Sequence, residues 1–406
     1  IEKLRIHNLF HLVDAVRIDL YGSLSLTGKG HATDIAVLLG LSGEDPETID
    51  VREIEDIIKD TELFKTIKLN GIKEVNFSTE DLIFNKEFLS YNPNGMTFTG
   101  YSEGKEISKE TFFSIGGGFI IQEDDNLVEE IEITKHNFPY PVNKALQLEE
   151  YCERENLQIS DIIFANELVL NSKETIDSEL SRVWETMLEC MYIGCHTSGN
   201  LPGGLHVKRR AFDTHQKLIK DAAYSNPQEW ITAIRSTEVK FREILKWVSC
   251  LALSVNEVNA SLGRVVTAPT NGSAGVIPAV LMYYLVIENH EADFEHIKKF
   301  LLVAGEIGSI FKKNATISAA MGGCQAEIGV SSAMAAAGLT ELLGGTAAQC
   351  LSAAEIAMEH HLGLTCDPIG GLVQIPCIER NSMGAIKAIH AAEIALETNP
   401  KESLVH

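Results

Sequence analysis

Hydrophobic residues alternate with polar ones in short runs along the first 122 residues. Val16–Leu20 alternates strictly, which predicts a half-buried strand. Met96–Tyr101 and Glu110–Ile121 are rich in β-branched and aromatic residues and predict two paired strands. The run Gly116–Gly118 interrupts the second of these and predicts a bulge or a close approach of another backbone or ligand.

Helix signals are interleaved with these strands. After the Gly-rich turn at residues 28–31, an apolar run begins at Thr33, and either Thr33 or Asp34 is expected to cap a short helix. Pro46 is expected to be the first residue of another helix. Strands and helices thus alternate, so the first 122 residues predict an α+β domain.

From about residue 145 onward, hydrophobic residues recur at helical spacing. Segments such as Ser331–Leu339 are apolar on most sides, which is typical of helices buried inside a bundle. Residues 123–144 are acidic, carry prolines and show neither period, so they predict a linker before an all-α domain at 145–406. The predicted helices are Asp161–Leu170, Glu174–Met191, Ile234–Leu262, Ala274–Ile287, Phe294–Phe311, Ala326–Leu343, Ala347–His360 and Ser382–Glu397.

Length and composition limit the number of domains and the kinds of partner. The 406 residues exceed the roughly 250 to 300 that one hydrophobic core holds, which agrees with two domains. A net charge of -23 repels nucleic acid and anionic lipid, so neither is expected as a partner. We find no apolar stretch of the roughly 18 to 20 residues that span a membrane, and we expect a cytoplasmic protein.

Eight cysteines are too few for a disulfide scaffold in a chain of this length. Cys324, Cys366 and Cys377 lie in Gly- and Pro-rich breaks, which we expect to be non-helical and able to converge. Their spacing matches neither a zinc pair nor a ferredoxin run, so a metal site and inert buried thiols both remain open. The others lie in helical patterns and are expected to be structural: Cys152, Cys190, Cys195, Cys250 and Cys350.

Further polar residues stand in the connecting segments, where binding residues concentrate. His31 follows a Gly-rich turn and could act as a general base or be an ordinary surface imidazole. The turn at residues 270–272 could hold a carboxylate or be a plain Asn-Gly turn. The stretch from Cys190 to Gly204, which contains Cys195-His196-Thr197, is a further candidate.

Read together, these stretches closely resemble the bacterial iron-sulfur L-serine dehydratases of the single-chain type. The resemblance covers nearly the whole chain. Its motifs are Asp19–Leu24 running into Thr27–His31, Ser114–Phe119, Leu201–Arg210, Asn256–Ala260 through Asn271-Gly272, Gly323–Gln325, and Met358–His360 through Asn381.

The resemblance implies an α+β domain, similar to a substrate-sensing domain of some phosphoglycerate dehydrogenases, followed by an all-α catalytic domain, usually in a homodimer. It also implies a [4Fe-4S] cluster held by Cys324, Cys366 and Cys377, with one iron left open to help expel the hydroxyl of L-serine. The products would be pyruvate and ammonia. His31 is the expected base, and the residues expected to hold serine are Lys29, His196, Thr197, Thr270, Asn271, Gly272 and Arg380.

The chain departs from the family at both ends. Members usually begin with a Ser-rich segment that contributes to the site, whereas this sequence opens at Ile1-Glu2-Lys3. Some members carry a C-terminal cysteine able to occupy the open iron, whereas this sequence closes on Leu404-Val405-His406. We expect these terminal segments to be missing from the 406 residues, and the fourth ligand of the cluster stays open.

Two other functions remain possible. One is a pyridoxal-phosphate-dependent serine or threonine dehydratase, for which Lys29, beside glycines, would form the Schiff base. The other is a non-catalytic sensor that binds serine through its first domain. The sequence leaves open the preference between serine and threonine and any regulatory role of the first domain.

Overall fold

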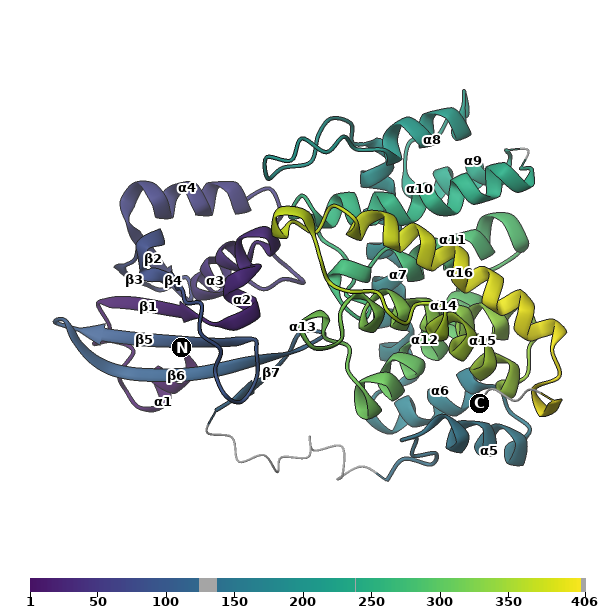
Figure 1. Cartoon of the computed structure of the whole chain (residues 1–406), viewed down its shortest axis with the longest axis horizontal. Coiled ribbons are helices and arrows are strands. Elements are labelled where there is room, and N and C mark those ends of the chain that lie inside the picture. Colours follow the sequence, from purple (N-terminus) through teal and green to yellow (C-terminus); the bar gives the residue numbers. More distant parts are fainter. Residues whose placement is uncertain (124–136, 238, 403–406) are drawn as a thin grey trace. The chain divides into compact units, whose positions relative to one another are not determined.

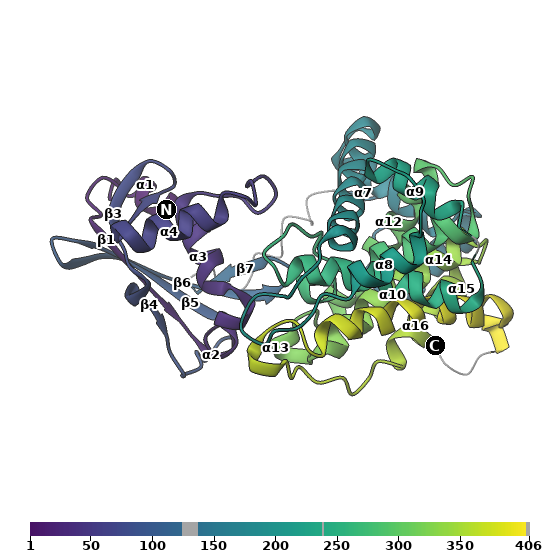
Figure 2. The ribbon, with the colours of Figure 1, turned by 90° about the horizontal axis from the view of Figure 1, so that it is seen from above.

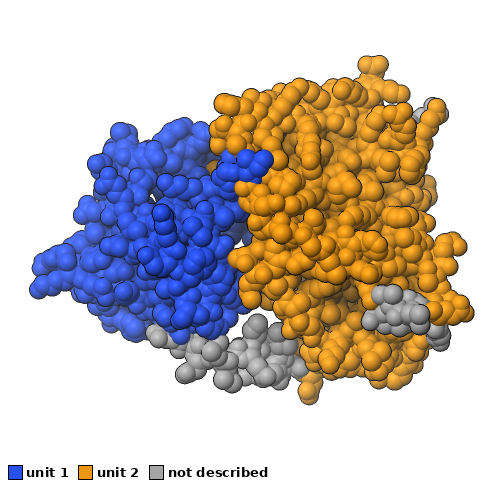
Figure 3. Space-filling model, viewed as in Figure 1, with its two compact units in different colours: residues 1–129, 369–373 blue, residues 130–368, 374–406 orange. Residues whose placement is uncertain are grey.

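The computed structural model describes residues 1–123, 137–237 and 239–402, and the chain forms two compact units (Figure 3). Unit 1 comprises residues 1–129 and 369–373, and unit 2 comprises residues 130–368 and 374–406. Unit 1 has a mixed sheet and unit 2 is helical, which confirms the predicted fold class (Figure 1). Most of the predicted linker, residues 124–136, lies outside the described residues.

Unit 1 is built on one mixed sheet that, among the described residues, has seven strands. The order is β2-β3-β1-β5-β6-β7, and β4 pairs with β1. β1 runs parallel to β3 and β4 and antiparallel to β5. The strands are β1 (Ala15–Leu20), β2 (Thr66–Leu69), β3 (Lys73–Asn76), β4 (Leu82–Phe84), β5 (Gly95–Ser102), β6 (Lys105–Gly116) and β7 (Phe119–Gln122).

Alternation in these strands buries one face of the sheet. Ile18 and Leu20 of β1 are fully buried and pack in one cluster with Val37 and Leu41 of a covering helix. The helical segments of unit 1 are α1 (Glu2–Ile6), α2 (Gly22–Leu26), α3 (Thr33–Ser42), α4 (Ile54–Phe64) and the short 3-10 turns η1 (Gly28–His31), η2 (Thr79–Asp81) and η7 (Ile369–Gly371).

The structure corrects three local expectations in unit 1. α3 begins at Thr33, but its N-cap is Ala32, with φ of 55°, and no side chain caps the helix. The helix that was expected to start at Pro46 is α4, which begins at Ile54, and residues 46–53 form turns before it. Gly116–Gly118 all have positive φ; Gly116 ends β6, and Gly117 and Gly118 form the turn to β7, so the single strand expected at 110–121 is two strands. The expected bulge is confirmed, because the pairing of β6 with β7 shifts register between Ser114 and Gly116.

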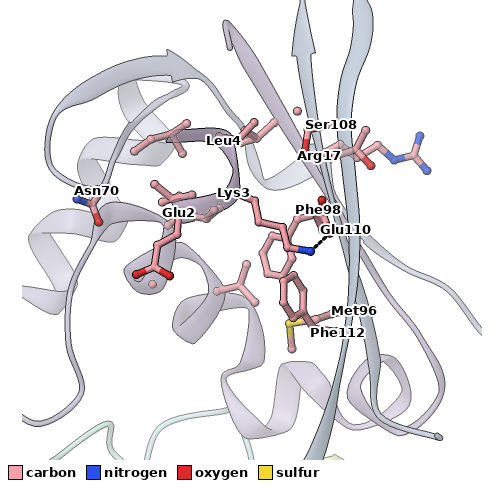
Figure 4. Close-up of a pocket in the computed structure, with 18 of the residues that line it drawn as sticks. Glu2, Lys3, Leu4, Arg17, Asn70, Met96, Phe98, Ser108, Glu110 and Phe112 are labelled. Carbon is pink, nitrogen blue, oxygen red and sulfur yellow. Dashed lines mark hydrogen bonds and ion pairs between the residues drawn. The ribbon is translucent and has the colours of Figure 1, made fainter. Parts of the chain in front are cut away.

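Unit 1 also contains a cavity of about 680 Å³ between α1, α3 and the sheet (Figure 4). Phe98 and Phe112 supply aromatic surface, and Lys3 forms an ion pair with Glu110 at 3.1 Å on its wall. Among the described residues that line this cavity there is no predicted site residue.

Unit 2 is a helical bundle whose elements were mostly predicted, although several boundaries differ. The prediction missed α5, α8, α9 and α13, and the helix predicted at 234–262 corresponds to α10, which begins only at Phe241. The helices are α5 (Ala145–Glu155), α6 (Ile159–Leu170), α7 (Lys173–His196), α8 (Ala211–Ile219), α9 (Pro227–Arg235), α10 (Phe241–Asn259), α11 (Val276–Tyr283), α12 (Phe294–Asn314), α13 (Ala319–Gly322), α14 (Ile328–Leu342), α15 (Ala347–Glu359) and α16 (Cys377–Glu397), with the 3-10 turns η4 (Asn271–Ser273), η6 (Cys324–Ala326) and η8 (Pro400–Glu402) and the π-turn η5 (Tyr284–Glu288).

α14 is the central helix of unit 2. Every residue from Ile328 to Glu341 is buried, and the helix packs against α11, α12, α15 and α16. Small residues such as Ala335 and Gly338 allow this close packing, because they keep the helix narrow on all sides. α10 and α16 run side by side along the bundle (Figures 1 and 2). The prediction of a buried, Ala-rich helix is confirmed.

The segment Asn271–Glu288 is long and apolar enough to cross a membrane, judged by length and composition. In the structure 78% of this segment is buried inside unit 2. Its middle part is α11, all of whose residues are buried. Core helices satisfy the same criterion, so α11 has an ordinary place in the packing of unit 2.

Candidate metal centre

Two of the three predicted ligands lie on loops of unit 2 that are hydrogen-bonded to each other. Cys324 opens the turn η6, and the Gln325 amide donates to the Leu364 carbonyl at 3.1 Å. Gly323, just before Cys324, has φ of 70°, and a Cβ there would lie 2.8 Å from the Leu364 carbonyl oxygen. Only glycine fits this conformation and this contact, so residue 323 lets the Cys366 loop lie against Cys324.

The sulfur atoms of Cys324 and Cys366 lie within 4.8 Å of each other and of a carboxylate oxygen of Glu327. Cys324 is buried, whereas Cys366 is exposed. Their hydrogen bond raises the pKa of Cys324, to which burial adds, and it lowers the pKa of Cys366. One thiol of the pair therefore gives up its proton first, and the thiolate is the form that binds metal.

Cys377 is the first residue of α16 and is buried. Cys377 was expected in a non-helical break, which is wrong, because α16 starts directly after Pro376 and not at Ser382. Burial raises the pKa of the Cys377 thiol to about 11, and the charges of Glu327 and Cys366 add to the rise.

Arg380 lies one turn further along α16 and faces the same thiols. Its guanidinium donates to the Cys324 sulfur at 3.1 Å, to the Thr365 carbonyl at 2.8 Å and to the Asp367 carboxylate at 2.9 Å. A fixed positive charge beside a thiol favours the thiolate. Arg380 thus favours the thiolate form of Cys324. Its expected role in holding the substrate stays a prediction.

Glu327 is the site residue that the sequence analysis missed. Its carboxylate accepts a hydrogen bond from the Thr270 hydroxyl, and the Cys324 thiol donates to it at 3.7 Å. A Cβ at Gly272 would lie 3.0 Å from the same carboxylate, so glycine allows that turn to approach. The signal in the sequence was the spacing of three between Cys324 and Glu327, which places two side chains on one side of a helical turn.

The Thr270-Asn271-Gly272 turn is held in place from two helices. The side-chain amides of Asn256, on α10, and Asn381, on α16, both donate to the Gly272 carbonyl, at 2.9 and 2.8 Å. Both asparagines are fully buried, so their hydrogen bonds are made in a low-dielectric interior. The turn is therefore rigidly placed beside Glu327, while its expected contact with a substrate carboxylate stays a prediction.

His196 and Thr197 were expected in a loop, but α7 extends through His196. The two ring nitrogens of His196 lie 2.6 Å from the Tyr192 carbonyl oxygen and 2.8 Å from the Tyr224 hydroxyl. Thr197 donates its hydroxyl to the Ile193 carbonyl at 2.7 Å. Both side chains thus bind within the fold, and their expected substrate contacts stay predictions.

Lys29 and His31 belong to unit 1, on the exposed turn η1. One ring nitrogen of His31 lies 2.8 Å from the Thr27 carbonyl oxygen, and the Lys29 ammonium lies 5.2 Å from the centroid of the Phe84 ring. Between them, Gly30 packs against the 369–373 segment of the same unit, where a Cβ would meet the Gly371 carbonyl oxygen at 2.1 Å. The role of His31 as a base stays a prediction.

Two family models match the chain and together cover nearly all of it. Residues 1–125 match the model described as serine dehydratase beta chain, and residues 154–406 match serine dehydratase alpha chain. L-serine dehydratase of Haemophilus influenzae is 45% identical over 402 residues, covering 98% of this chain and 85% of that protein.

Other curated proteins agree with this match. L-serine dehydratase 2 of Escherichia coli is 45% identical over 96% of this chain and 82% of its own length. L-serine dehydratase of Streptomyces coelicolor is 43% identical over 97% of this chain and 84% of its own length. Each similarity extends through both units, so it covers unit 1 as well as the cysteines of unit 2.

Proposed function

The chain belongs to the serine dehydratase family, and from this premise we propose that it is a lyase that converts L-serine into pyruvate and ammonia. Loss of the α-proton and of the hydroxyl group as water gives aminoacrylate. Aminoacrylate tautomerises to the imine, which water hydrolyses to pyruvate and ammonia. The identity to proteins named L-serine dehydratase, over nearly the full chain, is the observation that carries this proposal.

The donor set in unit 2 fits a [4Fe-4S] cluster bound by Cys324, Cys366 and Cys377. Cys324 and Cys366 lie close together and would move apart to bind separate irons, and the charge of Cys366 contributes to the raised pKa of Cys377. Arg380 offers a positive charge to balance thiolates. When bound by three cysteines, such a cluster keeps one iron free to act as a Lewis acid for the leaving hydroxyl, worth several kcal/mol.

The residues of the chain would then place and deprotonate the substrate. The hydroxyl of Thr270, the amide of Asn271 and the backbone at Gly272 form the turn that we propose binds the serine carboxylate, since backbone N–H groups in such turns suit anions. Its position is set by Asn256 and Asn381. Arg380, His196 and the Thr270 hydroxyl all bind protein groups in the structure, so the backbone N–H groups of the turn are the donors proposed for the carboxylate.

His31 is the proposed base for the α-proton. One ring nitrogen is occupied by the Thr27 carbonyl, which leaves the other to accept a proton. A base positioned in this way contributes roughly 100- to 10,000-fold to the rate.

His31→Ala tests this role. After anaerobic reconstitution with iron and sulfide, we expect the variant to keep its iron, sulfide and visible absorption while pyruvate formation from L-serine falls by roughly 100-fold or more. His11→Ala, an exposed histidine of the same unit, is the matched control and should remain active. Normal turnover by the His31 variant would exclude it as the base.

Reconstitution itself separates this proposal from the alternatives. Activity that follows broad visible absorption and is lost when oxygen bleaches it supports the cluster, whereas activity restored by pyridoxal phosphate supports a Schiff base at Lys29. Serine binding without turnover would support a sensor. We further propose a cytoplasmic homodimer, for which light scattering should give twice the mass of one chain.

A further inference from the structure

Glu327 places a carboxylate oxygen among the thiols of unit 2. This oxygen and the sulfur atoms of Cys324 and Cys366 all lie within 4.8 Å of one another. Among the described residues, Cys377 is not part of this close group. Cys324 and Glu327 are both buried, at 3% and 9% exposure, so two of the three donors are fixed by the interior of the unit.

Donor separations below 4.8 Å are close to those around a single ion. Around one tetrahedral zinc ion, thiolate sulfur lies about 2.3 Å and carboxylate oxygen about 2.1 Å from the metal, so neighbouring donors are about 3.5 to 3.8 Å apart. The Cys324 sulfur and the Glu327 oxygen are 3.7 Å apart. In a [4Fe-4S] cluster each thiolate binds a different iron, which requires the sulfurs to spread further.

We propose that Cys324, Cys366 and Glu327 bind one divalent zinc ion when no iron-sulfur cluster is present, with water at the fourth position. Two thiolates and a carboxylate are donors that zinc accepts, and three protein ligands plus water is a coordination that it commonly adopts. This site concerns the cluster-free protein and does not depend on the proposed lyase activity.

The surroundings suit the charge and the geometry of this site. Three anionic donors and one divalent cation leave one net negative charge. The Arg380 guanidinium, 3.1 Å from the Cys324 sulfur, can balance this charge. Thr270 donates its hydroxyl to the Glu327 carboxylate, as an outer partner that orients a metal ligand. Cys366 is the exposed member of the three donors.

The consequence is competition for two of the three cysteines. Zinc binds a given set of donors more tightly than ferrous iron does. Occupation of Cys324 and Cys366 by zinc would therefore prevent cluster assembly. Cys377, the remaining thiol, is required by the cluster alone, and Glu327 is required by the zinc site alone.

Cobalt(II), a spectroscopic substitute for zinc, tests the proposal on the full-length, cluster-free protein. The protein should bind one cobalt ion with tetrahedral absorption bands and a thiolate-to-cobalt charge-transfer band, and zinc should displace it. Cys377→Ser should bind cobalt as the parent does but fail to take up iron and sulfide. Glu327→Gln should bind cobalt at least about 10-fold more weakly, a minimum set by the cost of losing even an outer partner, yet still take up iron and sulfide.

Matched controls make each result decisive. Glu379→Gln changes an exposed glutamate of α16 that pairs with Arg210 and should leave cobalt binding unchanged. Cys366→Ser changes an exposed ligand and should abolish the charge-transfer band without unfolding the helices. Equal cobalt affinity in the Glu327 and Glu379 variants would overturn the role of Glu327. Loss of cobalt binding in the Cys377 variant would show that three thiolates bind it, and absence of the charge-transfer band in the parent would refute the site.

Discussion

At the scale of single residues, Gly323 shows how one position can decide whether two loops meet. Its φ of 70° and ψ of -171° lie in a region that essentially only glycine adopts. A side chain there would also press on the Leu364 carbonyl. The two loops carry Cys324 and Cys366, so a change at Gly323 acts on the metal centre without altering a ligand.

We expect Gly323→Ala to lower the free energy of unfolding by about 1 to 3 kcal/mol and to reduce the iron bound per chain. Gly344→Ala is the control, because Gly344 also has positive φ, of 89°, but a Cβ there meets no atom within 4 Å. Chemical denaturation and iron analysis measure the two effects. Equal iron content in both variants would contradict the role given to Gly323.

Two buried histidines of unit 2 should destabilise it in acid. Burial, aided in His215 by the neighbouring His196, lowers the pKa of His215 to about 4, and burial likewise lowers the pKa of His361 to about 4. Trp230 donates its indole N–H to His215 at 2.9 Å, which requires an unprotonated ring nitrogen. Between the ordinary pKa of about 6.5 and the folded pKa, only the unfolded chain binds the proton.

The contribution of each histidine to the free energy of unfolding should therefore fall by up to about 3 kcal/mol as pH drops from about 6.5 to 4. We expect His215→Gln to be less sensitive to pH in this range, since the amide does not titrate and its oxygen can accept from Trp230. Urea denaturation at several pH values measures the slope. An unchanged slope in the variant would show that His215 does not cause it.

At the scale of elements, α7 and α10 touch through their backbones. A Cβ at Gly194 of α7 would lie 2.3 Å from the Ser254 carbonyl oxygen of α10. α10 in turn packs along α16, the helix that carries Cys377 and Arg380. The separation of these helices thus depends on one small residue.

Gly194→Ala should destabilise the protein by about 1 to 3 kcal/mol, because a methyl group there forces the helices apart. Gly305→Ala, in α12, meets no atom within 4 Å and should instead stabilise by up to about 1 kcal/mol through higher helix propensity. Thermal or urea unfolding of both variants reveals the opposite signs. Destabilisation of similar size in both would argue against a close α7–α10 contact.

At the scale of the whole molecule, each unit has its own hydrophobic core. The core of unit 2 includes Cys152, Cys190, Cys195, Cys250 and Cys350, as the sequence predicted. Among the described residues of that core, none of the three proposed ligands appears. The metal centre therefore lies beside this core, and we expect the helices to fold without the metal.

Removal of iron by oxygen and a chelator should accordingly abolish pyruvate formation and visible absorption while the far-ultraviolet circular dichroism stays unchanged. Reconstitution with iron and sulfide should restore activity without a refolding step. Loss of helical signal on chelation would indicate that the metal holds the bundle together.

The sequence by itself determined the two kinds of unit, because burial repeats with a period of two in strands and 3.6 in helices. Val16–Leu20 as a strand and the wholly buried α14 followed from that period alone. It also indicated the three cysteines as candidates, since they stand in or beside breaks of the pattern.

Only the tertiary structure decided which polar groups meet. Glu327 reaches Thr270 across 57 positions, and Asn256 and Asn381 reach one carbonyl from two helices. It also decided that His196 ends a helix and binds Tyr224. Hydrophobic periodicity records how each residue is buried in its own element, whereas these contacts depend on how distant elements pack, which no local pattern contains.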